Sequence, residues 1–220
     1  MHPILESPLS DPGAVFGRGG EPYLLEGAST SKCNKEGEHS LILRSPAHGG
    51  VIAGVTFLVT RLPDDGWVLL VGGLQGSAKE GTPEAIKAIT KSLHGLRPNA
   101  LLVFALRQLA GAWRLGSIRA VGNQGHISQH ADYRFNRSRR PRLAYDEFWR
   151  ECGGEERGDG FFELPVRHRP RADASSPAHK RAACRRREAW LAGLGQALQA
   201  RLAGLGPTAE PAPHPGCAPI

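Results

Sequence analysis

Two histidines carry the side chain best suited to moving a proton near neutral pH. His94 lies in the segment HGLRP, and His126 follows a predicted strand. A neutral imidazole can accept the proton that an amine loses before it attacks a carbonyl carbon, and a desolvated carboxylate can do the same. The carboxylate candidates are Glu36, Glu38 and Asp132. Spacing singles out none of the five, so a surface position or a satisfied hydrogen bond stays open for each.

The segment His94–Pro98 directly precedes a strongly apolar predicted helix. Helix N-termini bind anions because their amides are unpaired and the helix dipole is positive there. Gly95 would let the backbone approach a phosphate, and Arg97 could pair with it bidentately. The alternative is an inter-helix turn in which His94 and Arg97 cap carbonyls of the preceding helix.

A glycine-dense segment, GGLQG, ends a predicted strand and is a second candidate for ligand binding. Gly72, Gly73, Gln75 and Gly76 could expose backbone groups that pair with a pantetheine-like arm. No Gly-Lys-Ser follows, so this is not a phosphate-binding Walker loop. A bulge of purely structural use is the alternative. Asn123, at another strand end, could bind either a ligand or a turn.

Two basic stretches favour an anionic partner. They contain Arg134, Arg137, Arg139, Arg140 and Arg142 with Tyr133 and Phe135 interleaved, and Lys180, Arg181, Arg185, Arg186 and Arg187. Such residues neutralise phosphates, but no nucleic-acid recognition motif accompanies them. An anionic membrane surface fits the last predicted helix at least as well, because leucines follow its arginines. A solvated charged face is the ordinary alternative.

Composition limits the class of protein. The chain has 220 residues, of which 40% are hydrophobic and 22% charged, and its formal net charge is +7. We expect a folded domain that prefers anions. No segment approaches the roughly 20 apolar residues of a membrane span, and the N-terminus lacks a secretory pattern. Four scattered cysteines suggest neither a zinc site nor disulfides, so we expect a cytoplasmic protein, peripheral at the inner membrane if it binds lipid.

The elements that must position these residues are predicted as a mixed α/β arrangement. Apolar, β-branched runs at 41–43, 51–59 and 67–71 predict antiparallel strands, with a hairpin turn at Pro63–Gly66. Amphipathic and apolar patterns predict helices over 82–93 and 99–114, then a strand at 118–123. A strand, buried helix, strand order predicts a parallel crossover.

The remaining elements complete one domain. A short helix begins at Tyr145, a strand at Phe161–Leu164 ends at Pro165, and a long helix begins near Ser176. We expect residues 1–22 to form a flexible arm, residues 23–205 the domain, and residues 206–220 a disordered Pro-rich tail.

Several of these segments, in this order, resemble the VirK/YbjX family. The matching blocks are KEGE at 35–38, GGLQG at 72–76, HGLRP at 94–98, YDEFW at 145–149 and the basic residues of 180–187. Family members usually have a longer N-terminal region and a Tyr where this chain has Cys184. The resemblance implies a bacterial domain of unknown biochemical function, linked to virulence, envelope stress and tolerance of cationic antimicrobial peptides.

The order of elements also resembles the core of GNAT-type N-acyltransferases, with a mixed, centrally antiparallel sheet and, here, a basic C-terminal helix. That resemblance implies acyl-coenzyme A as donor, its phosphates at HGLRP, and His94 or His126 assisting an amine acceptor. A shared fold does not establish a shared function. The alternative is a non-catalytic module that binds membrane lipid or, less well supported, nucleic acid.

Overall fold

The computed structural model describes residues 13–29, 36–48, 50–76, 82–126, 144–170 and 177–203. Its centre is an eight-stranded sheet with the order β1-β2-β3-β4-β5-β6-β8-β7 within these residues. Its strands are β1 (Gly13–Phe16), β2 (Pro22–Ser29), β3 (His39–Ser45), β4 (Gly50–Leu62), β5 (Gly66–Gly76), β6 (Ser117–Val121), β7 (Glu155–Glu156) and β8 (Phe161–Leu164). Neighbouring strands are antiparallel except β5 and β6, which are parallel. The predicted α/β class with a mixed, centrally antiparallel sheet is confirmed.

The longest strands, β4 and β5, form the predicted hairpin. Leu62 pairs with Gly66, whose φ of 69° is one that glycine adopts without strain. Farther along, Thr56 pairs with Gly73 but the next residue, Phe57, pairs with Val71. Gly72 is therefore an extra residue in β5, and the strand carries a β-bulge there.

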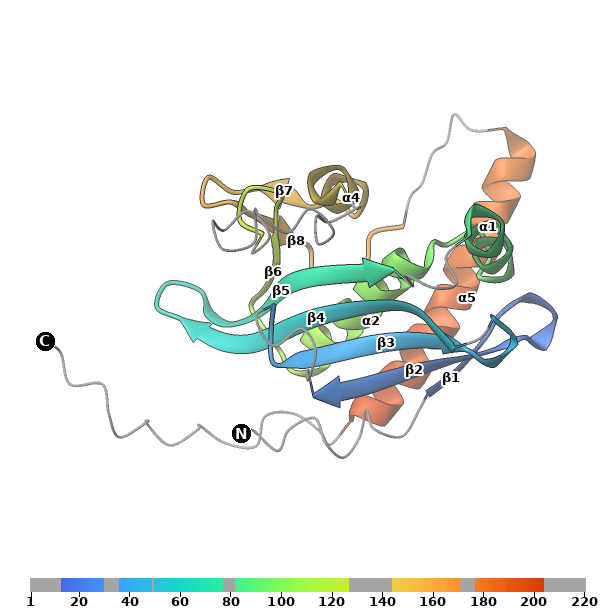
Figure 1. Ribbon diagram of the computed structural model, residues 1–220, viewed down its shortest axis with the longest axis horizontal. Helices are drawn as coiled ribbons and strands as arrows, with labels where there is room; N and C mark the ends of the chain where they lie inside the picture. The colour runs from blue at the N-terminus through green and yellow to red at the C-terminus, as the bar shows by residue number, and fades with distance from the viewer. Residues whose placement is uncertain are drawn as a thin grey trace, which may run out of the picture.

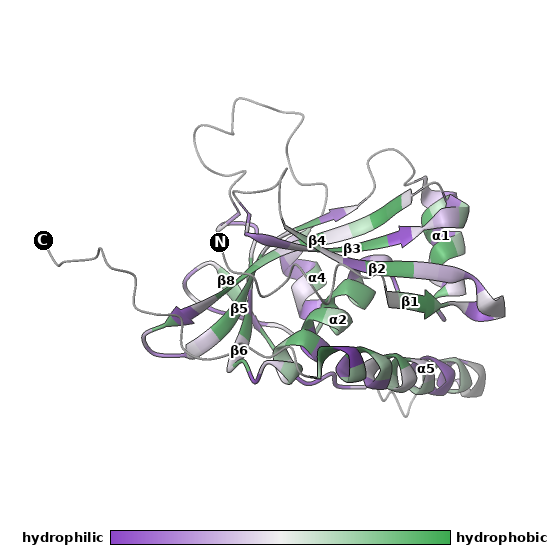
Figure 2. Ribbon diagram, turned by 90° about the horizontal axis from the view of Figure 1, so that it is seen from below, coloured by the Kyte–Doolittle hydropathy of each residue, from purple (hydrophilic) through white to green (hydrophobic). Residues whose placement is uncertain are grey.

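The helices are α1 (Pro83–Ser92), α2 (Pro98–Ala112), α4 (Tyr145–Glu151) and α5 (Ala178–Leu202). Two helices, α2 and α5, lie in successive layers behind the sheet, and α1 lies beside one end of its strands (Figures 1 and 2). In Figure 2, α2 lies between the sheet and α5, and it contacts both. A helix covered on two sides must be apolar around most of its circumference, which explains the run LLVFAL at 101–106.

The connection from β5 through α1 and α2 to β6 is the predicted parallel crossover. Thr82 caps α1 with its hydroxyl, which accepts a hydrogen bond from the amide of Ala85, and Pro83 occupies the first turn. The β5–β6 ladder runs from Val68–Ser117 to Val71–Ala120 and ends there. Beyond it, β5 continues along β4 as far as Gly76.

The sheet extends into the segment 1–22 that was expected to form a flexible arm. β1 pairs with β2 in the register Val15–Tyr23, and a short 3₁₀ turn, η1 (Arg18–Gly20), connects them. Val15 and Tyr23 are both buried in the core. The sequence did not predict β1, because its apolar run is short and lies among glycines and prolines. Its buried side is formed only when it pairs with β2. The predicted tail at 206–220 lies outside the described residues.

The leucines of α5 pack inward. Leu191, Leu198 and Leu202 are buried in the same core as α2, and Leu194 is partly buried against it. The apolar side of α5 therefore covers α2, and only its basic residues remain for the membrane contact that was one alternative for this helix. No helix in the described ranges has the length and hydrophobicity to cross a bilayer.

Candidate functional site

A carboxylate and an imidazole lie together where β5 bulges. Oε1 of Glu36 is 3.9 Å from Nε2 of His126, which is 6% exposed. Oε2 of the same carboxylate accepts a hydrogen bond from Nε2 of Gln75, at 3.3 Å. Glu36 precedes β3, Gln75 belongs to β5 and His126 follows β6, so three separate segments build this cluster.

Tyr145, the first residue of α4, completes the cluster. Its ring stacks on that of His126, with centroids 5.0 Å apart, and its hydroxyl is 3.4 Å from Nε2 of His126. The same hydroxyl accepts a hydrogen bond from the amide of Leu74 at 3.1 Å and donates to the Leu74 carbonyl at 3.2 Å. It therefore holds the edge of β5 at the point where β6 no longer pairs with it. We name Glu36, Gln75, His126 and Tyr145 the proton-transfer cluster.

Glycines allow the segment around Glu36 to lie directly on the hairpin. A Cβ at Gly72 would overlap the backbone carbonyl of Glu36, and one at Gly73 would overlap its carboxylate. Gly37 is equally close to the backbone of Phe57 on β4. The predicted bulge of structural use is present, and its effect is to bring Glu36 to the cluster.

Asn123 and Asp146 fix the start of α4. Oδ1 of Asn123 accepts a hydrogen bond from the amide of Tyr145 at 3.1 Å, and Oδ1 of Asp146 accepts one from the amide of Asn123 at 2.8 Å. Of the two roles predicted for Asn123, the structure shows the local hydrogen bond. Asn123 thus positions Tyr145.

Burial shifts the pKa values of Glu36 and His126 toward each other. It raises the pKa of Glu36, an effect that the hydrogen bond from Gln75 partly opposes. It also lowers the pKa of His126. In both cases the charged form loses hydration, so proton affinities that differ in water become more similar here.

The HGLRP segment forms an inter-helix turn, as the alternative predicted, but backbone hydrogen bonds hold it, and the His94 and Arg97 side chains contact Trp190 and Glu151. The amide of Gly95 donates to the Thr90 carbonyl at 2.7 Å, and the amide of Leu96 donates to the Leu93 carbonyl at 3.0 Å. His94 and Gly95 have φ values of 56° and 83°, which reverse the chain after α1. Two amides that the anion hypothesis needs are therefore already bonded to the chain's own oxygens.

His94 does not join the proton-transfer cluster. Its ring stacks on that of Trp190 in α5, with centroids 5.1 Å apart. Burial, followed by the charges of Arg18 and Arg186, lowers the pKa of His94. Arg97 forms an ion pair with Glu151 at 3.1 Å between two well-exposed side chains.

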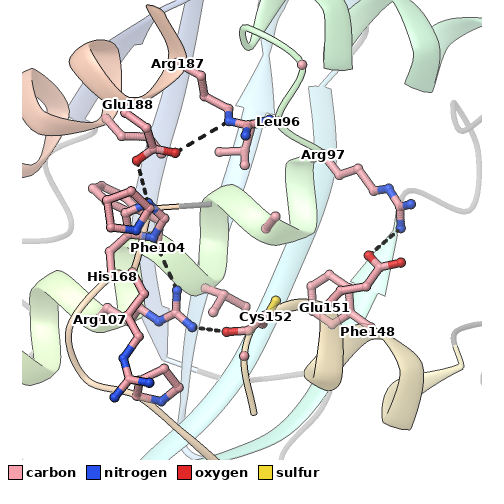
Figure 3. A pocket seen from close by; sticks show the side chains of 18 of the residues that line it. Leu96, Arg97, Phe104, Arg107, Phe148, Glu151, Cys152, His168, Arg187 and Glu188 are labelled. Atoms are coloured by element: carbon pink, nitrogen blue, oxygen red, sulfur yellow. Dashed lines mark hydrogen bonds and ion pairs between the residues drawn. The ribbon is translucent and has the colours of Figure 1, made fainter. Parts of the chain in front are cut away.

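Gly95 and Arg97 do line a cavity of about 540 Å³ between α2, α4, α5 and the segment after β8 (Figure 3). Five arginines and two glutamates line it: Arg97, Arg107, Arg150, Arg169 and Arg187 with Glu151 and Glu188. The apolar part of the cavity wall includes Leu96, Val103, Phe104 and Phe148. We name this the arginine cavity. In the described ranges, no three side chains of the metal-binding types gather as a metal site needs.

The other predicted anion-binding residues are dispersed or outside the described ranges. Lys180, Arg181, Arg185 and Arg186 are exposed on the first half of α5. Arg139, Arg140 and Arg142 lie outside the described residues, together with Arg134, Arg137 and the carboxylate candidate Asp132. Glu38 is exposed, and Gly76 ends β5 with open space beside it.

The structure therefore brings together His126, Gln75, Gly72, Gly73 and Glu36 from the predicted candidates. Sequence analysis missed the hydroxyl of Tyr145, because its i, i+3, i+4 spacing with Phe148 and Trp149 indicated only a core stripe. It also missed Arg107 and His168 in the arginine cavity. Arg107 lies inside an apolar helix pattern, and that isolated charge was the available signal.

Comparisons with known proteins agree on a family but not on a reaction. A family model described as "Protein of unknown function (DUF535)" matches residues 8–200. The "Uncharacterized protein YbjX" of Escherichia coli is 29% identical over 83% of this chain, and a Haemophilus influenzae protein is 30% identical over 91%. The chain spans 56% and 63% of the lengths of these two relatives.

Among solved structures, mutants of a cAMP-binding acyltransferase from Mycobacterium smegmatis align with 82% and 87% of this chain and with 56% of their own. The identities are 15% and 13%, and the TM-scores are 0.40 and 0.38. A similarity this low supports no functional argument.

Proposed function

Since the chain belongs to the DUF535 family, which is the VirK/YbjX family of the sequence resemblance, we propose a function from its own residues: transfer of an acyl group from acyl-coenzyme A to an amine. The proposal adopts the chemistry of GNAT-type acyltransferases. The observation that carries it is the proximity of Glu36 and His126 in the proton-transfer cluster, where the two side chains are 3.9 Å apart and are 18% and 6% exposed.

Acyl transfer to an amine needs a proton acceptor of this kind. An amine is protonated at neutral pH and attacks a thioester only after it loses a proton. Burial raises the pKa of Glu36 and lowers the pKa of His126, and these are the two groups of the cluster that could take that proton.

The proposed reaction balances in two steps. Glu36 accepts a proton from the ammonium, and the neutral amine nitrogen forms a bond to the thioester carbonyl carbon. The C–S bond then breaks, the amide nitrogen gives up its second proton by way of His126 to the leaving thiolate, and the proton held by Glu36 is released to solvent. Tyr145 acts as a positioning residue, because it stacks on His126 and bonds to Leu74.

The end of the β5–β6 ladder supports this site for the donor. From Gly72 onward β5 has no ladder partner on its β6 side within the described residues, so its edge can face a ligand. At Leu74 that edge is already occupied by Tyr145. A pantetheine arm would therefore bind at Gly72, Gly73, Gln75 or Gly76 rather than at Leu74.

Binding of an anionic surface is the alternative function, and the exposed side chains of Lys180, Arg181, Arg185 and Arg186 favour it. Because the α5 leucines are buried, such binding would be electrostatic alone. It would weaken steeply with salt, both for anionic vesicles and for nucleic acid.

The experiment that tests the acyl-transfer proposal is thiol release from acyl-coenzyme A in the presence of amines. Acyl chains of several lengths are combined with lysine peptides, polyamines and aminoglycosides. We expect release by the wild-type chain and a loss of about 10²–10⁴-fold in Glu36→Gln and in His126→Gln. Glu84→Gln, an exposed carboxylate on α1, is the matched control and retains full turnover. Turnover that both cluster substitutions leave unchanged overturns the proposal.

A further inference from the structure

Arg107 carries a buried charge with an incomplete set of partners. The residue is 6% exposed and lies in α2, on the wall of the arginine cavity. Its Nη2 donates to the carbonyl of Cys152 at 2.5 Å, and its Nη1 is 3.5 Å from Nδ1 of His168. Its Nε is buried and has no hydrogen-bond partner among the described residues.

Among the residues that the structure describes, the charge of Arg107 also lacks a counter-ion. None of the ion pairs between described residues includes it. The C-terminal carbonyl of α4 at Cys152 offsets only part of a full positive charge. An uncompensated charge inside a protein is costly, and buried charges are normally paired. The missing negative charge is therefore expected from a molecule that enters the cavity.

Neighbouring groups keep Arg107 directed into the cavity (Figure 3). The Nε2 of His168 is 2.8 Å from a carboxylate oxygen of Glu188, so its Nδ1 is turned toward Arg107. Arg187 is 3.8 Å from the same Glu188. The glutamate is thus shared between His168 and Arg187 and does not reach Arg107.

The other arginines of the cavity differ from Arg107. Arg97 pairs with Glu151, and Arg150 pairs with Glu156 at 2.5 Å, both between exposed side chains. Their charges are already balanced and hydrated. Arg169 is exposed, so Arg107 is the arginine whose charge lies at the buried wall of the cavity, where an electrostatic contact is strongest.

The size and walls of the cavity limit the ligand. Its volume of about 540 Å³ lies in the range of small-molecule sites. Phe104 and Phe148 provide aromatic wall, and Leu96 and Leu191 add aliphatic surface. A ligand that fits has an anionic group for Arg107 and an apolar or aromatic body.

We propose that the arginine cavity binds an organic phosphate, with the phosphoryl group paired to Arg107 and the organic body against Phe104 and Phe148. A guanidinium matches a phosphate bidentately. Arg169 and Arg187, which line the same cavity, supply further positive charge. This site is independent of the acyl-transfer proposal, because none of its residues belongs to the proton-transfer cluster.

The test measures binding of three probes by thermal shift and calorimetry: inorganic phosphate, adenosine 5′-monophosphate and dihexanoyl phosphatidic acid. We expect inorganic phosphate to bind weakly and one of the two organic phosphates to bind more tightly, which identifies a nucleotide-type or a lipid-type body. Arg107→Met should weaken that binding about 10- to 100-fold. Arg61→Met, at an exposed arginine of β4, should leave it unchanged.

A second measurement needs no variant. Cys152 lines the cavity and is half-buried, whereas Cys184 is half-buried on α5 and does not line it. The bound probe should slow alkylation of Cys152, read by peptide mass spectrometry, and leave the rate at Cys184 unchanged. The proposal is overturned if Arg107→Met does not weaken binding, or if none of the probes slows alkylation of Cys152.

Discussion

The carboxylate of Glu36 occupies the space that a side chain at position 73 would need. Gly73 sits beside the β-bulge of β5, and a Cβ built there overlaps the carboxylate. The glycines of GGLQG and the carboxylate of KEGE are thus two halves of one contact, although 37 positions separate Glu36 from Gly73. The contact fixes the position of one member of the proton-transfer cluster.

The carboxylate can move aside from a methyl group, but the backbone carbonyl of Glu36, which a Cβ at the neighbouring Gly72 would overlap, cannot; Gly72→Ala should therefore destabilise the protein by about 1–3 kcal/mol. The matched control is Gly111→Ala in α2, where nothing lies within 4 Å of the added Cβ. That change should stabilise the helix by about 0.5–1 kcal/mol. Urea denaturation of both variants measures the difference, and equal free energies of unfolding would contradict the contact.

Tyr145→Phe should cost about 1–3 kcal/mol of stability, because the buried amide and carbonyl of Leu74 lose their partner. The ring remains and still stacks on His126. Slow hydrogen exchange at the Leu74 amide in the wild-type chain should become fast in the variant. An exchange rate that does not change would show that the hydroxyl does not hold this strand edge.

Glu36→Gln should gain stability at neutral pH relative to the wild type and not at pH 4. Burial raises the pKa of Glu36, so the folded state binds the proton more tightly than the unfolded state. The stabilisation that Glu36 contributes is fully present below its pKa in the unfolded chain. It is lost as the pH rises through its pKa in the folded chain. Glutamine keeps the hydrogen-bonding shape without that loss. Denaturation at pH 4 and pH 7.5 compares the two chains, and a variant less stable at pH 7.5 would refute the assignment.

Leu191→Ala should destabilise the protein by about 2–5 kcal/mol, since the side chain is 1% exposed between α5 and the core. Gln196→Ala, on the exposed side of the same helix, should change stability by less than about 0.5 kcal/mol. Thermal unfolding of both variants tests whether the leucines of α5 are core residues. A tolerated Leu191→Ala would restore the membrane-surface interpretation of this helix.

Sequence patterns predicted most of the fold because the signals were local. The turn at Pro63–Gly66, the cap at Thr82 and the apolar circumference of α2 each depend on neighbouring residues. β1 and β2 were missed because their core face becomes visible only in the pairing Val15–Tyr23. The sequence left open whether the leucines of α5 face a lipid surface, because a leucine repeat has the same pattern whether it covers α2 or a membrane.

The site was predicted as separate candidates and not as an arrangement. His126 and Glu36 could be named as proton acceptors, but their proximity depends on a bulge at Gly72 and on the start of α4. Tyr145 and Arg107 lie in helical patterns that indicated core packing. The role of their polar atoms depends on which groups these atoms contact in the folded chain. Burial of a charge without a counter-ion is a property of the folded chain.

The account depends most on coupling between Glu36 and His126, and NMR titration of the His126 imidazole tests it without any substrate. In the wild-type chain the pKa of His126 should lie below the ordinary value of about 6.5, because burial disfavours the charged ring. In Glu36→Gln it should fall further, because the carboxylate that favours the imidazolium is gone. An imidazole that titrates identically in both chains, or that is charged at neutral pH, would contradict the proposed proton transfer.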